Sequence, residues 1–157
     1  MNPSQSGRHR CRLRGLASAL LGAALIASIV VDAKQAAPVP ASKSAWDGVF
    51  SKDQLERGRT AYNAQCARCH GETLGGGENS PALVDERFFT TWGGRTVGEL
   101  VEYTRTTMPS DGPGKISRKR CIDIAAYVLG ANGFPAGDHE FPTELDALDR
   151  ITITRTR

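Results

Sequence analysis

The segment Cys66-Ala67-Arg68-Cys69-His70 constrains this chain more than any other feature of its sequence. Two cysteines three positions apart at the end of a helix project to one side, so both thiols can bond a single group on that face. The histidine that follows can then reach a metal at the centre of that group. A C-x-x-C-H sequence is typical of covalent haem attachment. One copy predicts one haem c, bound through Cys66 and Cys69, with His70 as an iron ligand.

Three other interpretations of the two cysteines stay open at this point. A thioredoxin-like dithiol needs a preceding strand, whereas here the motif ends an amphipathic helical pattern. A zinc site needs further ligands, and after the N-terminal segment is removed only Cys121 and His139 could supply them. A disulfide between Cys66 and Cys69 is the ordinary outcome in an exported protein.

Residues 1–33 have the pattern of an export signal. Four arginines and no acidic residue occur in residues 1–14, and the apolar run Leu16–Val31 follows. The small-residue site at Val31-Asp32-Ala33 then predicts cleavage after Ala33 and a periplasmic protein. The alternative is an uncleaved membrane anchor, although a membrane-spanning helix needs about 20 apolar residues.

The charge of the whole chain belongs to this signal. The chain has 20 basic and 17 acidic residues, a net charge of +3. Cleavage after Ala33 removes four arginines and Asp32, which leaves 16 of each kind. The exported chain therefore has no net charge that would favour a nucleic-acid partner.

Helical periodicity and capping patterns predict an all-α domain between a flexible Ala/Pro/Ser-rich linker at residues 34–49 and a polar C-terminal tail at residues 138–157. No strand pairing is evident for the tail. The predicted helices run from about Lys52 to Ala64 after a capping box at Ser51 and Gln54, from Thr96 to about Thr106 after a capping box at Thr96 and Glu99, and from Ser117 to about Gly130 with Cys121, Ile124, Ala125 and Val128 inward.

Met108 is the candidate for the second axial position of the iron. It is the only methionine left after the signal is removed, and it lies 38 positions after His70. Methionines usually fill gaps in a hydrophobic core. This one stands in a polar stretch at residues 106–110, which favours a ligand role.

These features resemble the class I cytochromes c over about residues 50–137. The residues that carry the resemblance, in their order and approximate spacing, are Gly58, Tyr62, Cys66, Cys69, His70, Pro81-Ala82-Leu83, Met108-Pro109 and Asp123–Val128. More narrowly, the small cytochromes associated with or fused to quinoprotein alcohol dehydrogenases are similar at Trp92-Gly93-Gly94, residues 106–114 and residues 132–137.

The resemblance implies a class I cytochrome c fold, in which the N- and C-terminal helices cross beside one covalently bound haem. At the crossing, Gly58 would let Tyr62 meet Ile124 and Tyr127, because a missing side chain allows two backbones to approach closely. The resemblance also implies that the carbonyl of Pro81 accepts a hydrogen bond from Nδ1–H of His70, which would orient the ring.

The implied function is one-electron transfer rather than catalysis. A periplasmic carrier of this kind would accept electrons from a dehydrogenase and pass them to an oxidase or another cytochrome of the respiratory chain. One alternative is a cytochrome subunit permanently bound to a quinoprotein dehydrogenase, and another is a haem enzyme or gas sensor with an open distal site. A basic turn at Arg118-Lys119-Arg120 is a candidate docking patch for an acidic redox partner.

Overall fold

The computed structural model describes residues 42–157, so the predicted signal and residues 34–41 of the predicted linker lie outside the described residues. In chain order, the elements are β1 (Lys43–Ser44), the 3-10 helix η1 (Ala45–Asp47), α1 (Lys52–Gln65), α2 (Ala67–His70), α3 (Asp85–Trp92), α4 (Val97–Thr107), α5 (Arg118–Ala131), α6 (Leu145–Leu148) and β2 (Ile151–Thr152). Because β1 and β2 are the only strands within residues 42–157 and have two residues each, the predicted all-α class is confirmed. In this range no helix combines the length and the apolar character needed to cross a membrane.

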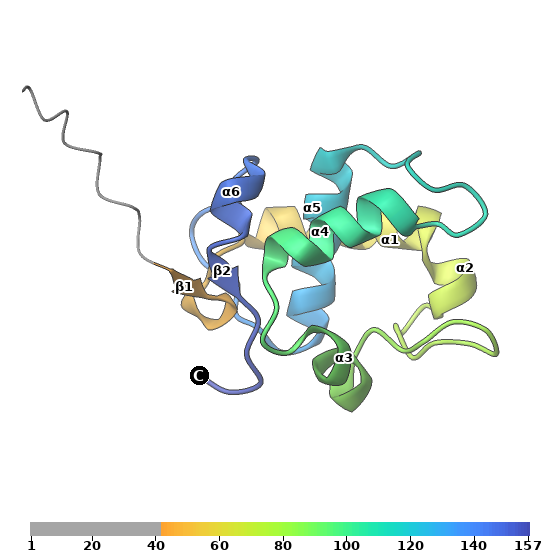
Figure 1. Cartoon of the computed structure of the whole chain (residues 1–157), viewed down its shortest axis with the longest axis horizontal. Helices are drawn as coiled ribbons and strands as arrows, with labels where there is room; N and C mark the ends of the chain where they lie inside the picture. Colours follow the sequence, from red (N-terminus) through yellow and green to blue (C-terminus); the bar gives the residue numbers. More distant parts are fainter. Residues whose placement is uncertain (1–41) are drawn as a thin grey trace, which may run out of the picture. The chain divides into compact units, whose positions relative to one another are not determined.

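Helices α1 and α5 pack against each other just before the C-x-x-C-H motif (Figure 1). A Cβ atom at Gly58 would lie 1.8 Å from the carbonyl oxygen of Asp123 and 3.0 Å from Cβ of Tyr127. One turn further along α1, the rings of Tyr62 and Tyr127 pack with their centroids 5.3 Å apart. The crossing expected at Gly58 is therefore present, and it depends on the absence of a side chain there.

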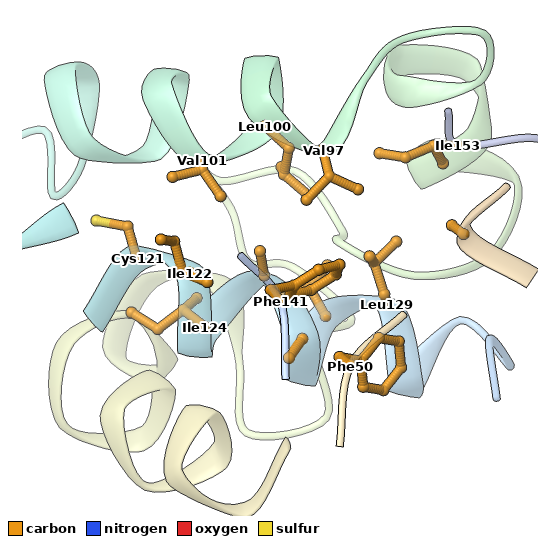
Figure 2. Close-up of a cluster of buried hydrophobic side chains, with 14 of the residues drawn as sticks. Phe50, Val97, Leu100, Val101, Cys121, Ile122, Ile124, Leu129, Phe141 and Ile153 are labelled. Carbon is orange, nitrogen blue, oxygen red and sulfur yellow. The ribbon is translucent and has the colours of Figure 1, made fainter. Parts of the chain in front are cut away.

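Part of the hydrophobic core lies between α4 and α5. Figure 2 shows Val97, Leu100 and Val101 of α4 facing side chains of α5. Cys121 is fully buried in this core, where its thiol donates a weak hydrogen bond to the carbonyl oxygen of Ile116. Burial raises the pKa of the Cys121 thiol to about 11. Cys121 is thus a small core residue and is protonated at neutral pH.

The predicted capping box of α1 is only half formed. The Ser51 hydroxyl accepts a hydrogen bond from the backbone N–H of Gln54, as expected. The side chain of Gln54 does not return to Ser51, because it is buried between other segments. Its Nε2 donates to Asp123 on α5 at 3.3 Å, and its Oε1 accepts from the backbone N–H of Phe141 at 2.8 Å. Gln54 therefore joins α1, α5 and the tail.

Residues 43–46, at the end of the predicted linker, pair with the C-terminal tail. Strand β1 pairs in parallel with β2, and Trp46 Nε1 donates to the carbonyl oxygen of Thr154 at 2.9 Å. Ala45 and Ile153 are completely buried. The sequence missed this pairing because the two segments lie about a hundred residues apart and neither has a strong local propensity.

The tail is therefore expected to stabilise the domain. Replacing Ile153 by alanine removes a fully buried side chain, and we expect a loss of about 2–3 kcal/mol in the free energy of unfolding. Guanidinium denaturation measures this loss. Thr156→Ala is the control, because Thr156 is exposed and bonds only through its backbone carbonyl, so its stability should match wild type. An unchanged Ile153→Ala protein would show that the tail does not contribute to the core.

Candidate functional site

The two cysteines of the motif lie at the two ends of one helical turn. Helix α1 ends at Gln65, and the chain turns again at once into α2. The backbone N–H groups of Cys69 and His70 donate to the carbonyl oxygen of Cys66 at 3.1 and 3.0 Å. Cys66 and Cys69 are free thiols, so the disulfide interpretation has no support here. Among residues 42–157, no three His, Cys, Asp or Glu side chains cluster as a zinc site requires.

His70 is held by the carbonyl that the resemblance implied. Its Nδ1 lies 2.9 Å from the carbonyl oxygen of Pro81, and the residue is only 8% exposed. A carbonyl can only accept a hydrogen bond, so Nδ1 carries the proton and donates it. In a neutral ring, Nε2 is then unprotonated and has a lone pair available for a metal.

The glycine-rich loop explains how Pro81 reaches His70. Gly76 has a left-handed backbone with φ of +83°, and its N–H donates to the carbonyl oxygen of His70 at 2.8 Å. A Cβ atom at Gly76 would lie 2.7 Å from the carbonyl oxygen of Ser80 and 2.7 Å from the backbone nitrogen of Ala82. Only glycine satisfies both conditions, so the loop can fold back and bring Pro81 against the histidine.

Gly76→Ala is expected to destabilise the holoprotein by about 2 kcal/mol, because alanine would be strained at a positive φ and would push the Ser80–Ala82 backbone away. Guanidinium denaturation measures the loss. The matched control is Gly75→Ala, where a Cβ would meet only the Thr73 hydroxyl at 3.4 Å. Equal stability of the two variants would contradict this account of the loop.

Helix α3 was missed by the sequence analysis, although it forms part of the site. It is only eight residues long, and Val84 at its N-cap makes no side-chain hydrogen bond, so the usual start signal is absent. The spacing of Phe88 and Trp92 by four positions was the available signal, and both are buried. Arg95, just after the helix, stacks on Trp92 with its guanidinium carbon 4.9 Å from the ring centroid.

One cavity brings most of these residues together. It has a volume of about 400 Å³, and Cys66, Cys69, His70, Pro81 and Met108 all line it. Its apolar walls come from the loop after the motif, α3, α4 and α5, and include Leu83, Phe88, Trp92, Leu100, Ile124 and Val128. All the candidate site residues predicted from the sequence thus line a single space, although His70 and Met108 lie far apart in the chain.

Burial raises the pKa of two side chains near the C-x-x-C-H motif. Burial raises the pKa of the Cys66 thiol to about 11. It also raises the pKa of Tyr62, whose hydroxyl donates to the carbonyl oxygen of Gly71 at 2.7 Å. Tyr62 therefore stays protonated and ties α1 to the residue that follows His70.

The residues present fit a haem. Two free thiols lie on one helical turn, and an imidazole nitrogen and a thioether line the same cavity. Apolar walls suit the macrocycle. Arg87 and Arg95 also line the cavity and could pair with the two propionate carboxylates of a haem.

The basic turn at the start of α5 lies outside this lining. Lys119 Nζ is 3.7 Å from the carboxylate of Asp123, a buried residue that also bonds Gln54 and Arg57. Lys119 therefore pairs with a carboxylate of its own domain. The basic turn is for this reason a weaker docking patch than its sequence indicated.

One comparison with known proteins, a family model, matches the segment that contains the C-x-x-C-H motif. A family model described as cytochrome c oxidase, cbb3-type, subunit III matches residues 53–128. A search of the curated proteins finds no match. Among solved structures, a chain of the sulfane dehydrogenase SoxCD from Paracoccus pantotrophus matches at 21% identity with a TM-score of 0.46. The match covers 69% of this chain and 61% of that one.

Proposed function

Because this chain is a class I monohaem c-type cytochrome, we propose that it is a periplasmic one-electron carrier that accepts electrons from a dehydrogenase and passes them to the respiratory chain. The chain has one haem c, attached through Cys66 and Cys69. The observation that carries the proposal is the placement of His70 and Met108 on the walls of one cavity.

When bound, the haem supplies a one-electron couple between ferric and ferrous iron. The two cysteines hold it on the turn after α1 and fix its position. Nε2 of His70 and the thioether of Met108 would bind the iron, and with both in place the iron would have no free position for substrate or gas. The carbonyl oxygen of Pro81 accepts a hydrogen bond from Nδ1–H of His70, which would hold the ring in one orientation toward the haem.

The apolar walls of the cavity would keep water away from the iron. Phe88, Trp92 and Leu100 are almost fully buried beside the cavity. A low-dielectric setting disfavours the more highly charged ferric state, and methionine ligation acts in the same direction. Both features raise the reduction potential, which suits an acceptor downstream of a dehydrogenase.

The proposal is tested by mixing the reduced, purified holoprotein with membranes of the source organism. We expect rapid oxidation that a terminal-oxidase inhibitor such as cyanide stops, with one electron delivered per chain. Failure of the membranes to oxidise the protein faster than buffer alone would contradict a carrier role in respiration.

Export is tested separately by fractionation. The proposal places the holoprotein in the periplasmic fraction, with Lys34 as its N-terminal residue by Edman sequencing. Recovery in the membrane fraction with residues 1–33 intact would instead show that the segment is an anchor.

A fixed subunit of a larger complex is the second candidate. The matched family model describes an oxidase subunit, which favours this alternative. Size-exclusion chromatography of a gentle extract distinguishes the two functions. A carrier elutes alone at the size of the chain, whereas a subunit co-elutes with a dehydrogenase or oxidase.

A further inference from the structure

The loop that carries Met108 has few ties to the rest of the domain. Met108 directly follows α4, and its N–H donates to the carbonyl oxygen of Thr104 at 3.0 Å. At the other end, Ile116 is buried in the core and Ser117 caps α5. Between these anchors, a turn closes from Gly112 N–H to the carbonyl oxygen of Pro109 at 2.9 Å.

One side-chain contact joins this loop to the haem-attachment turn, which is the turn formed by residues 66–70. The carboxylate of Asp111 pairs with the guanidinium of Arg68, the residue between Ala67 and Cys69. Within the described part of the chain, this is the only side-chain hydrogen bond or ion pair that joins residues 109–115 to another segment. Both partners also line the cavity. The pair therefore connects the two segments that would hold opposite ligands of the iron.

We infer that the Arg68–Asp111 ion pair is a positioning contact that holds the loop of residues 108–116 against the haem-attachment turn and so keeps Met108 on the iron. The inference rests on the proposed ligation by Met108. Arg68 and Asp111 do not touch the reacting iron. They would act through the loop, by lowering the fraction of time in which the thioether of Met108 is detached from the iron.

The size of the effect follows from the exposure of the pair. The side chains of Arg68 and Asp111 are 78% and 61% exposed, so water and salt screen their attraction. An exposed ion pair changes an equilibrium by about two- to five-fold. A change of this size is too small to alter the fold, but a ligand that competes with Met108 for the iron would report it directly.

The test is imidazole binding to the ferric holoprotein at low ionic strength, followed by loss of the Met–Fe(III) charge-transfer band. In Arg68→Gln and in Asp111→Asn, we expect imidazole to bind about two- to five-fold more tightly than in wild type. Arg68→Lys keeps the charge and should stay close to wild type. The double variant should equal either single variant, because the two residues act as one contact.

Two controls separate this effect from general changes in surface charge. Glu56→Gln breaks the exposed Arg59–Glu56 pair on α1, neither member of which lines the cavity, and it should leave imidazole affinity unchanged. At about 1 M salt the difference between Asp111→Asn and wild type should vanish, since the screening length falls to about 3 Å.

The inference would be overturned if Arg68→Gln and Asp111→Asn bound imidazole with wild-type affinity. It would also be overturned if the increases in imidazole affinity of the two single variants added in the double variant. A wild-type protein without the charge-transfer band would be a different failure. That result would refute ligation by Met108, and the positioning role would fall with it.

Discussion

Replacing Met108 by alanine is expected to abolish the Met–Fe(III) charge-transfer band at the red edge of the oxidised spectrum and to lower the reduction potential. If Met108 binds the iron as proposed, loss of its thioether would remove a ligand that stabilises ferrous iron, and it would open that position to water. Axial ligands set haem potentials over a range of about 0.8 V, so we expect a fall on the order of 0.1–0.3 V. Absorption spectroscopy and a potentiometric titration of the variant measure both changes.

His139→Ala is the matched control for this prediction. His139 is the other histidine within the described residues, and it is exposed and absent from the cavity lining. Its replacement should leave the band and the potential unchanged. If Met108→Ala kept the wild-type band, or if His139→Ala lost it, the ligand assignment would be wrong.

The second large effect is expected at Gly58. In Gly58→Ala the new Cβ would lie 1.8 Å from the carbonyl oxygen of Asp123, so α1 and α5 would have to move apart. Overpacking costs about 1–3 kcal/mol where side chains can adjust. Here the obstacle is backbone, and we expect a loss of about 4 kcal/mol in the free energy of unfolding, at the upper limit of such effects. Guanidinium denaturation of the holoprotein measures it.

Gly130→Ala provides the comparison on α5 itself. A Cβ there would lie 2.3 Å from Cδ1 and 3.3 Å from Cγ of Leu55, a side chain that can rotate, and at an ordinary contact distance of 3.9 Å from the ring of Phe50. Alanine also has a better helix propensity than glycine by about 1 kcal/mol, so this variant should stay within about 1 kcal/mol of wild type. A Gly58→Ala protein as stable as Gly130→Ala would mean that the helices do not cross at this distance.

The features that the sequence predicted correctly are local ones. The capping signals at Ser51, Thr96 and Ser117 lie within one turn of the helix starts that they mark, and α1, α4 and α5 begin where these signals stand. The C-x-x-C-H motif is likewise contained in five consecutive residues. Patterns of this kind depend on backbone geometry over a few consecutive residues. They can therefore be recognised in a single sequence.

The features that the sequence missed depend on distant contacts. Gln54 meets Phe141 rather than its own helix start, and residues 43–46 pair with the tail. The pairing of Arg68 with Asp111 joins residues 43 positions apart. None of these contacts follows from local propensity, because each exists only after the helices have packed.

The site shows the same division. Cys66, Cys69 and His70 were predicted from the motif alone, and Met108 was predicted because it is the only methionine outside the predicted signal. The contributions of α3 and Arg95 to the cavity became visible only in three dimensions. The reason is that Val84 provides no side-chain cap for α3, and the N–H of Asp85 donates instead to Oδ1 of Asn132, which is 47 positions away in the sequence.

The central claim is that this chain carries a single electron on an iron saturated by His70 and Met108. A potentiometric titration of the purified holoprotein, with full spectra at each potential, tests it most directly. The account predicts one Nernstian one-electron wave, with the Met–Fe(III) band present in the oxidised spectra and lost on reduction. An oxidised spectrum without that band, together with a reduced protein that binds carbon monoxide at once, would contradict it.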